Sequence, residues 1–253
     1  MLKQEQNHFP SQSDGDDPST AHHKNGDNRG ATVMDRPRLF SGLLPGDYAS
    51  ICRAAVVGQF TRGEMLHFEG DAVERVFLLT SGCVKITKFS PGGEEVILRL
   101  AMPGDVLGAV ALFSSGMHCN TAQVFRACQA LIWDTRVIED LVERFPVLHQ
   151  NMATILDEHL RELEVRFREM ATERVGPRVA LQLLRLLKLI GRPVHTGVEV
   201  DLSREELAQM TGATLFTVSR LLSAWEARGI VRPRREAVAI CDISSLRAIS
   251  GEE

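Results

Sequence analysis

Short apolar runs separated by glycine turns fill residues 58–134, and this pattern restricts the fold of the chain more than any other feature. The runs cover residues 75–79, 83–89, 95–100, 121–125 and 130–133. The breaks between them are Glu69-Gly70-Asp71, Ser81-Gly82, Pro91-Gly92-Gly93 and Pro103-Gly104-Asp105. Short strands with turn signals roughly every ten residues are typical of an antiparallel sandwich or barrel. The pattern therefore predicts a first domain that is all β.

A helical period replaces this pattern from Val137 onward. Pro146 lies where a helix can begin, and neither Pro nor Gly follows it until Gly176-Pro177. Within that span, apolar residues repeat at alternating spacings of three and four: Ala153, Leu156, Leu160, Leu163, Phe167 and Met170. Such a heptad seam buries its apolar side against a partner helix. We therefore predict a coiled-coil dimer seam, the alternative being a helix packed on its own domain; the seam residues are Leu156, Leu160, Leu163, Phe167 and Met170.

Composition narrows the class of protein. The chain is 44% hydrophobic and 25% charged, close to the average for soluble globular proteins. No apolar run approaches the length of about 18 residues that a membrane span needs. Residues 1–35 are mostly polar and lack the apolar core of a signal peptide, so they are expected to form a disordered tail. His8, His22 and His23 in that tail are interpreted as solvated side chains rather than metal ligands.

The five cysteines are scattered, at Cys52, Cys83, Cys119, Cys128 and Cys241. They form no CxxC motif and no paired spacing. This distribution is typical of reduced thiols in the cytoplasm rather than of a disulfide framework or a structural zinc site. A cytoplasmic protein with no metal site is expected.

Residues 203–228 carry the most informative local pattern. Ser203-Arg204-Glu205-Glu206 is a capping box, in which a serine caps a helix whose third position is glutamate. Gly212 can take a positive φ in a tight turn, and Thr214 can cap a second helix over residues 215–228. That second helix has an apolar inner face made of Val218, Leu221, Leu222 and Trp225. Helix, glycine turn and amphipathic helix together predict a helix-turn-helix.

A basic hairpin is expected directly after it, over residues 229–240. The stretch from Arg204 to Arg235 holds six Arg against three Glu, although the whole chain has a net charge of −4. A winged helix with outward-facing arginines is typical of proteins that read the major groove of DNA.

With these motifs in place, the chain from about Leu39 to Leu246 resembles the Crp/Fnr-type transcription regulators. Four segments in the right order carry the resemblance: Phe68-Glu69-Gly70-Asp71; Pro103-Gly104-Asp105 with Gly108 and Leu112-Phe113; the long helix; and residues 202–208 through 217–222. The resemblance implies an α+β fold with a double-stranded β-helix (jelly-roll) sensor domain, a long dimerisation helix and a C-terminal winged helix-turn-helix. We expect these parts at residues 36–136, 137–172 and 173–253, after the tail at residues 1–35.

The resemblance also implies which residues touch DNA. Ser219 and Arg220 match the Ser-Arg pair on the recognition helix of the Fnr branch, where the arginine reads guanine in each half-site. Arginine bonds guanine O6 and N7 bidentately, which suits that role. Leu215-Phe216 replaces the usual polar pair and could contact thymine methyl groups. The expected DNA-binding set is Arg204, Thr214, Leu215, Phe216, Thr217, Ser219, Arg220, Arg234 and Arg235.

The sensor pocket departs from the cyclic-AMP binders that the chain resembles. Those proteins use a Glu after the glycine that is Gly108 here, an Arg-Ser pair in the next strand segment and a Thr-Ser pair on the dimer helix. This chain has Ala109, Asn120-Thr121 and Leu163-Glu164 at those places. The acceptor for the ribose hydroxyl and the cation for the phosphate are both lost, so cAMP is not the expected signal. The expected pocket residues are Gly108, Ala109, Asn120, Thr121 and Leu163.

Three other signals stay open. Haem could be ligated by a histidine or cysteine, the candidates being His67, His118, His149, His159 and Cys83. A redox role for Cys119 or Cys128 is the second alternative. A small metabolite or anion in the barrel is the third. An iron–sulfur cluster is not expected, since the N-terminal segment has no cysteine cluster.

The functional prediction is a homodimeric transcription regulator that binds a palindromic site on double-stranded DNA and contacts RNA polymerase, with no membrane partner. A second hypothesis is a cyclic-nucleotide-type binding module that acts on a protein partner. The basic hairpin and the Ser219-Arg220 pair argue against it. No nucleophile–base set and no phosphate loop appear in the sequence, so an enzyme is not expected.

Overall fold

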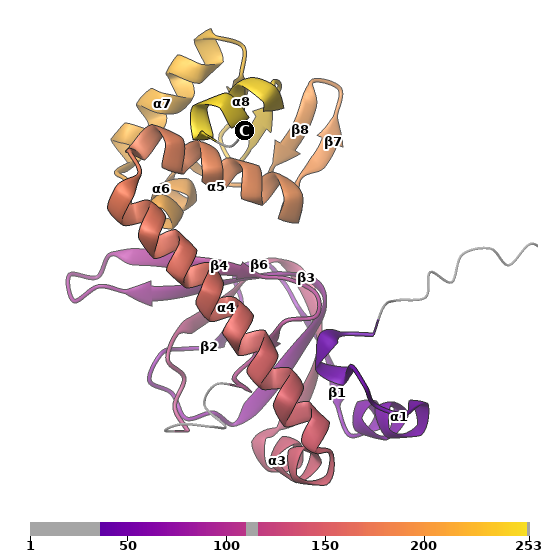
Figure 1. Cartoon of the computed structure of the whole chain (residues 1–253). Helices are drawn as coiled ribbons and strands as arrows, with labels where there is room; N and C mark the ends of the chain where they lie inside the picture. Colours follow the sequence, from indigo (N-terminus) through magenta and orange to yellow (C-terminus); the bar gives the residue numbers. More distant parts are fainter. Residues whose placement is uncertain (1–35, 110–115, 252–253) are drawn as a thin grey trace, which may run out of the picture. The chain divides into compact units, whose positions relative to one another are not determined.

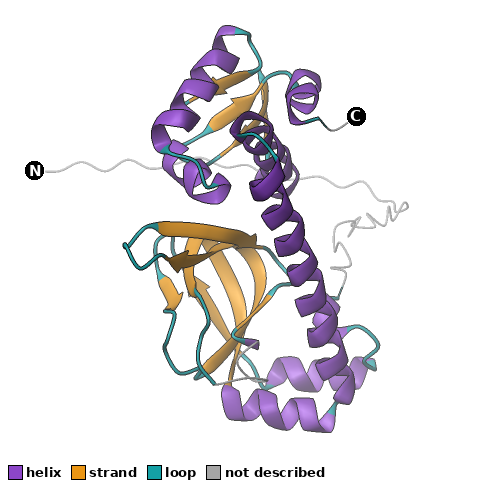
Figure 2. Cartoon of the chain, turned by 60° about the vertical axis from the view of Figure 1, so that its left-hand side comes forward, coloured by secondary structure: helices purple, strands orange, loops and turns teal. Residues whose placement is uncertain are grey.

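The computed structural model describes residues 36–109 and 116–251. The predicted tail with His8, His22 and His23, and the Leu112-Phe113 pair, lie outside these residues. Within them there are two antiparallel sheets, and each sheet has helices packed beside it (Figures 1 and 2). This α+β architecture confirms the predicted fold class.

The first sheet makes up the sensor domain. Its strands are β1 (Val56–Phe60), β2 (Met65–His67), β3 (Arg75–Phe89), β4 (Glu95–Ala101), β5 (Val106–Leu107) and β6 (Thr121–Asp134). The order is β1-β6-β3-β4, with β2 paired to β6 and β5 paired to β3, all antiparallel. The sheet curls on itself (Figure 2), as the predicted jelly roll does.

The two longest strands differ from the sequence expectation. Residues 75–79 and 83–89 form one continuous strand, β3, and residues 121–125 and 130–133 form one strand, β6. The expected turn at Ser81-Gly82 is instead a bulge: the register between β3 and β6 shifts around Ser81, and Gly82 has a φ of 78°. A glycine inside a strand marks such a bulge as readily as a turn. The bulge bends the strand without ending it.

Helices cover one side of this sheet. The short η1 (Arg38–Phe40) and α1 (Pro45–Arg53) pack with α3 (Thr135–Arg144) and α4 (Pro146–Thr172) around Trp133, which is 1% exposed. The indole Nε1 of Trp133 donates to the Ile51 carbonyl at 3.0 Å. Asn151 on α4 donates to the carbonyls of Leu39 and Ser41 at 2.8 Å each. These bonds fix the first turns of α4 to the sensor domain.

The expected dimerisation segment, residues 137–172, consists of two helices. The first, α3, begins at Thr135 and ends at Arg144, and Pro146 begins α4 as the sequence predicts. The helix α4 ends at Thr172, before Gly176-Pro177. That dipeptide lies in the first turn of α5 (Val175–Ile190). The N–H groups of a first turn have no partner in the helix, so a proline there costs no hydrogen bond.

The C-terminal part is the predicted winged helix. After α5 come β7 (Arg192–Val194), β8 (Gly197–Val200), α6 (Arg204–Thr211), α7 (Leu215–Ala227), β9 (Val231–Pro233), β10 (Val238–Ile240) and α8 (Ile243–Ser250). The second sheet has the order β7-β8-β10-β9. Leu183, Leu186, Leu207, Val218 and Leu222 are fully buried between its helices and this sheet.

The Gly82 bulge gives a first prediction, with Gly93 as its control. Both glycines have positive φ, so alanine at either is strained by about 1–2 kcal/mol. At Gly93 a Cβ atom would meet nothing within 4 Å, whereas at Gly82 it would lie 2.2 Å from the Ala127 carbonyl oxygen. We expect Gly82→Ala to lower the unfolding free energy by roughly 2–3 kcal/mol more than Gly93→Ala does, measured by urea denaturation. Equal losses in the two variants would contradict the bulge geometry.

Candidate nucleic-acid interface and sensor pocket

Caps hold both ends of α6 and the start of α7. The Ser203 hydroxyl accepts from the Glu206 N–H at 3.1 Å, and the Glu206 carboxylate accepts from the Ser203 N–H at 2.8 Å, which is the predicted capping box. Gly212 has a φ of 57° and ends α6. The Thr214 hydroxyl then accepts from the Thr217 N–H at 3.2 Å and caps α7. The Gly212 conformation and the Thr214 cap set the direction in which α7 leaves the turn.

One face of α7 is buried and the other is open. Val218, Leu222 and Trp225 point into the domain core. The first turn presents Leu215, which is 50% exposed, and Phe216, which is 74% exposed. Arg220 is exposed one turn later, and Thr217 and Ser219 are half-buried beside it. Large apolar side chains held in water at the start of a helix mark a contact surface, and Arg220 adds a bidentate donor to that surface.

The wing hairpin β9–β10 places its arginines unequally. Arg232 and Arg235 are exposed. Arg234 is exposed as well, but it also forms an ion pair at 3.1 Å with Glu199 of β8, a residue that is only 2% exposed. Arg192 donates to the other oxygen of the same carboxylate at 2.7 Å. Sequence reasoning placed Arg234 on DNA but did not identify its buried partner, because the pairing of β8 with β10 brings the two together only in the fold.

Arg204, the last member of the expected DNA-binding set, occupies the first position of α6. It is half-buried, and its Nε atom has no hydrogen-bond partner among the described residues. A guanidinium placed at this helix end can donate to a phosphate oxygen. Thr214, Leu215, Phe216, Thr217, Ser219 and Arg220 thus gather on the turn and first half of α7, Arg204 lies on α6, and Arg234 and Arg235 lie on the wing.

The predicted dimer seam lies on the second half of α4. The first half of the helix is buried in the sensor domain through Leu148, Met152 and Ile155. Further along, the exposed fractions are 56% for Leu160, 39% for Leu163, 76% for Phe167 and 50% for Met170, while Leu156 is half-buried. A single chain leaves this apolar row in water.

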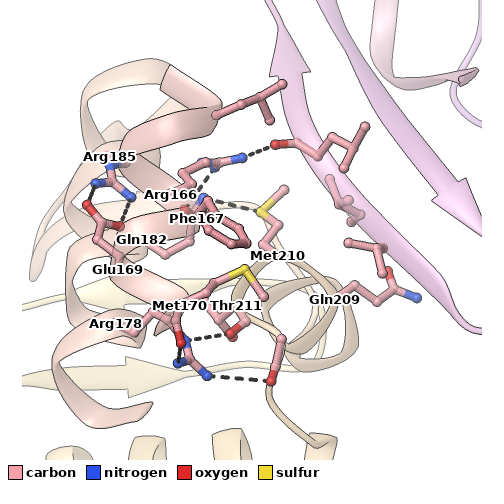
Figure 3. Close-up of a pocket in the computed structure, with 15 residues that line it drawn as sticks. Arg166, Phe167, Glu169, Met170, Arg178, Gln182, Arg185, Gln209, Met210 and Thr211 are labelled. Atoms are coloured by element: carbon pink, nitrogen blue, oxygen red, sulfur yellow. Dashed lines mark hydrogen bonds and ion pairs between the residues drawn. The ribbon is translucent and has the colours of Figure 1, made fainter. Parts of the chain in front are cut away.

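The expected sensor-pocket residues do not all lie together. Leu163 lines an apolar cavity of about 280 Å³ next to β4, α5 and α6, shown in Figure 3. Within it, Arg166 donates to the Leu98 carbonyl and to Gln182, and Arg185 forms a bidentate ion pair with Glu169. Gly108, Ala109, Asn120 and Thr121 belong to a different part of the sensor domain. Of the two roles predicted for Leu163, in the pocket and in the seam, its place on the second half of α4 agrees with the seam.

The side chains of Asn120 and Thr121 form hydrogen bonds within the sensor domain. Asn120 Oδ1 lies 3.2 Å from Nε2 of His67, and the Thr121 hydroxyl accepts from the Glu69 N–H at 3.0 Å. Ala109 is 3% exposed and has no polar side-chain atom to offer. Gly108 has a φ of 85°, and a Cβ there would lie 2.8 Å from the Arg75 carbonyl oxygen, so only glycine fits. Sequence reasoning missed the contact of His67 with Asn120, 53 residues apart.

The haem and redox candidates are placed as follows. His67 and His118 are each 7% exposed, and His159 lies 3.4 Å from the Asp105 carboxylate. Burial raises the pKa of the Cys83 thiol to about 12 and also raises the pKa of Cys128, which makes both poor thiolates. Cys119 is exposed and accepts from Asn120 Nδ2 at 3.4 Å. No group of three or more His, Cys, Asp or Glu suited to a metal ion occurs in residues 36–109 and 116–251.

No helix in the described part of the chain is long and apolar enough to cross a membrane.

Two family models match the chain. Residues 57–145 match the cyclic nucleotide-binding domain, and residues 177–249 match the Crp-like helix-turn-helix domain. The chain is 30% identical to a global nitrogen regulator of Synechocystis over 75% of its own length and 85% of that protein. It is 28% identical to the CRP-like cAMP-activated global transcriptional regulator of Mycobacterium tuberculosis, over 85% of its own length and 96% of that protein.

Solved structures share the fold. The c-di-GMP responsive global regulator CLP of Xanthomonas campestris superposes with a TM-score of 0.69 at 20% identity, covering 77% of this chain and 98% of that one. A mutant of CooA from Carboxydothermus hydrogenoformans superposes with a TM-score of 0.63 at 23% identity, covering 79% and 90%. At these identities the likeness concerns the fold alone.

The capping box yields a second prediction. Ser203→Ala removes the acceptor for the Glu206 N–H at the start of α6, whereas Ser203→Asp keeps an acceptor there. We expect the alanine variant to lose about 1 kcal/mol of unfolding free energy of the C-terminal domain and the aspartate variant to lose little, in thermal or urea unfolding. Indistinguishable stabilities for Ser203→Ala and the parent protein would mean that the cap contributes nothing.

Proposed function

The chain belongs to the Crp/Fnr family of transcription regulators, and from that premise we propose that it is a homodimer that reads a palindromic DNA site under the control of a signal other than cAMP. It is a Crp-like transcription regulator with a helix-turn-helix DNA-binding domain. The observation that carries the rest is the exposed face at the start of α7, where Phe216 and Arg220 extend from a turn held by Gly212 and by the Thr214 cap.

Direct readout by α7 is supported by the chemistry of this face. Arg220 can donate two parallel hydrogen bonds to guanine O6 and N7. Leu215 and Phe216 lie one turn earlier and suit the methyl group of thymine. Arg204, Arg232 and Arg235 supply charges that suit backbone phosphates, while Arg234 has part of its charge offset by Glu199. Arg234 is therefore proposed to orient the wing as well as to face DNA.

Dimer formation is supported by the apolar row on α4. Four side chains of the heptad seam are exposed in the single chain, and a second copy of α4 would cover all four at once. A two-fold dimer places two α7 helices about one helical turn of DNA apart, roughly 34–36 Å. The two-fold symmetry of such a dimer calls for a palindromic site. Contact of the bound dimer with RNA polymerase is part of the proposal for a regulator of this family.

The proposal that cAMP is not the signal rests on Ala109 and Asn120. The similar Mycobacterium protein is by its name activated by cAMP. In this chain, Ala109 has no acceptor for a ribose hydroxyl, and Asn120 has an amide rather than a guanidinium to meet a phosphate charge. The Asn120 carbonyl oxygen is also already bonded to His67. At the place of Asn120, the phosphate of cyclic AMP would lose hydration and gain an amide rather than a cation.

The third prediction tests readout by Arg220. DNA selected from a random-sequence pool should contain a palindrome, and Arg220→Ala should lose about 1–3 kcal/mol per half-site on the selected DNA and relax one base pair in each half. Arg136→Ala, which removes an exposed arginine on α3, is the control and should bind as the parent protein does. Binding would be measured by fluorescence anisotropy across a salt series. Equal loss by Arg220→Ala on selected and random DNA would make Arg220 a phosphate contact instead.

The fourth prediction tests the seam. Leu160→Glu puts a charge into the centre of the apolar row, so the variant should be monomeric at micromolar concentration in sedimentation equilibrium. Arg168→Glu changes an exposed residue of α4 outside the seam and should remain dimeric. A dimeric Leu160→Glu protein would show that the association surface lies elsewhere.

A further inference from the structure

A second cavity lies beside α4, on a different face of the helix from the seam. It has a volume of about 540 Å³ and lies between α4, α5 and the end of β4 with the turn that follows it. Helix α4 lines it with Glu158, His159, Glu162, Val165 and Arg166. Of the described residues that line it, none belongs to the predicted seam or to the expected sensor pocket. This α4–α5 cavity is therefore separate from both.

Three elements each bring an arginine to the α4–α5 cavity. Arg99 comes from β4, Arg166 from α4 and Arg185 from α5. Two of them have a carboxylate partner: Arg99 donates to Asp105 at 2.8 Å, and Arg185 binds both oxygens of Glu169. Three guanidinium groups thus have two carboxylate partners.

Arg166 is the guanidinium without a carboxylate partner. Its two bonds go to neutral oxygens, the Leu98 carbonyl and the Gln182 amide (Figure 3). It is half-buried, and no ion pair joins it to a carboxylate in the described part of the chain. A partly buried charge with neutral partners alone is costly, and an anion that reaches it offsets that cost.

The charges around Arg166 act on it from several elements. Burial and then Arg185 lower the pKa of its guanidinium, and Arg99 lowers that pKa further, while Glu162 and Glu169 raise it. Like charges therefore lie close to one another at the cavity, in a place where burial weakens their hydration.

The guanidinium groups have donors that a ligand can reach. The Nε atoms of Arg99, Arg166 and Arg185 have no hydrogen-bond partner among the described residues, and none of these atoms is fully buried. The side chain of Arg185 is 31% exposed, and Lys188, one turn later on α5, is exposed and forms no ion pair with a described residue. Against the unpaired Arg166 and Lys188, the lining has one unpaired carboxylate, Glu162. The unpaired side chains thus carry a net positive charge.

The other cations at the rim are paired with carboxylates. Arg38 pairs with Glu158, and Arg161 pairs with Asp157 at 2.8 Å, one turn earlier on α4. Both pairs are exposed, so each contributes little to stability and does not prevent these arginines from meeting a stronger acceptor.

Apolar side chains also line the cavity. They include Met102, Pro103, Val165 and Leu189, of which Val165 is 40% and Leu189 is 47% exposed. Apolar surface beside several cations suits an organic anion better than an inorganic one, because the carbon part of the ligand leaves water on binding.

The number of donors favours a phosphate over a carboxylate. A phosphate monoester has three terminal acceptor oxygens and about two negative charges at pH 7, whereas a carboxylate has two oxygens and one charge. Guanidinium groups from several elements can therefore bond to one phosphate, and their planar fork matches its geometry.

We propose that the α4–α5 cavity binds a small organic phosphate monoester, whose terminal oxygens accept from Arg166, Arg185 and Lys188. Its apolar part rests on Val165 and Leu189. This site goes beyond the proposed function, since phosphate binding here does not depend on how α7 reads DNA.

The test compares phenyl phosphate, benzoate, benzylamine and inorganic phosphate by titration calorimetry on the full-length protein at pH 7.5. We expect phenyl phosphate to bind on the order of tenfold more tightly than benzoate, because it has a further charge and a further acceptor oxygen. Inorganic phosphate should bind several-fold more weakly than phenyl phosphate, because it has no apolar part, and benzylamine should not bind. Benzoate or inorganic phosphate that binds as tightly as phenyl phosphate, or no binding of phenyl phosphate up to about 5 mM, would overturn the proposal.

Two variants and a control connect binding to the cavity. Lys188→Glu reverses an exposed charge and should weaken phenyl phosphate binding about tenfold, and Arg166→Met keeps an unbranched side chain and should abolish binding. Arg168→Glu makes the same change in net charge on α4 outside the cavity and should alter the affinity less than about twofold. Equal losses in Lys188→Glu and Arg168→Glu would show that binding follows net charge alone and would refute the site. Thermal unfolding checks that each variant folds, and Lys188→Glu decides the question if Arg166→Met does not.

The arginines that face DNA also attract phosphate, so Arg220→Ala separates the two surfaces. This variant should lose DNA readout and keep phenyl phosphate binding. Loss of phenyl phosphate binding in Arg220→Ala would place the probe on α7 and refute the α4–α5 site. Intact phenyl phosphate binding by a parent protein that does not distinguish selected from random DNA would refute the proposed function alone.

Discussion

The two ends of α4 have different partners, and the rest of the structure depends on that division. Met152 and Ile155 are buried against the sensor domain, so the first half of the helix cannot rotate without opening that core. Toward its end, Glu169 is 8% exposed and holds the guanidinium of Arg185 on α5 through both oxygens. Removing one partner of such a pair leaves the buried Glu169 carboxylate or its guanidinium without compensation. Between these anchors, Leu160, Leu163 and Phe167 stay exposed in the single chain.

Side chains of the sensor sheet also contact α4 and α6 near the junction of α4 with α5. Arg166 reaches the carbonyl of Leu98 on β4, and Gln209 of α6 donates to Glu95 at 3.2 Å. Ile97 and Leu100 share an apolar cluster with Leu207 and Met210 of α6. Arg126 on β6 adds bonds at 3.1 Å to the Ile190 carbonyl and to Asp201. The sensor sheet and α6 thus contact each other through side chains as well as being joined by α4 and α5.

The sensor domain has an amide where the cyclic-AMP binders that the chain resembles have an arginine. This residue, Asn120, is bonded to His67, whose ring is kept neutral by burial. The pocket beside His67 has two carboxylates, Asp71 and Glu74, and one guanidinium, Arg75. Burial makes each unmatched polar atom count, because water cannot replace a missing partner there. The same principle acts in the wing, where Glu199 is buried and two arginines meet it. In both places, one buried polar group organises the side chains around it.

The sequence by itself determined the class of each part, since local periodicity and caps are properties of neighbours in the chain. The glycine-spaced runs predicted the β domain, Pro146 began α4 where expected, and the Ser203 capping box and Gly212 predicted the helix-turn-helix. The turn expected at Ser81-Gly82 was wrong as a strand end, because the same glycine also permits a bulge and only pairing with β6 selects between the two. The tertiary structure alone decided that Leu163 lies away from Asn120, that Arg234 meets Glu199, and that His67 stacks on His118 with one nitrogen unpaired. These contacts join residues far apart in sequence, and their chemistry depends on burial, which no local pattern specifies.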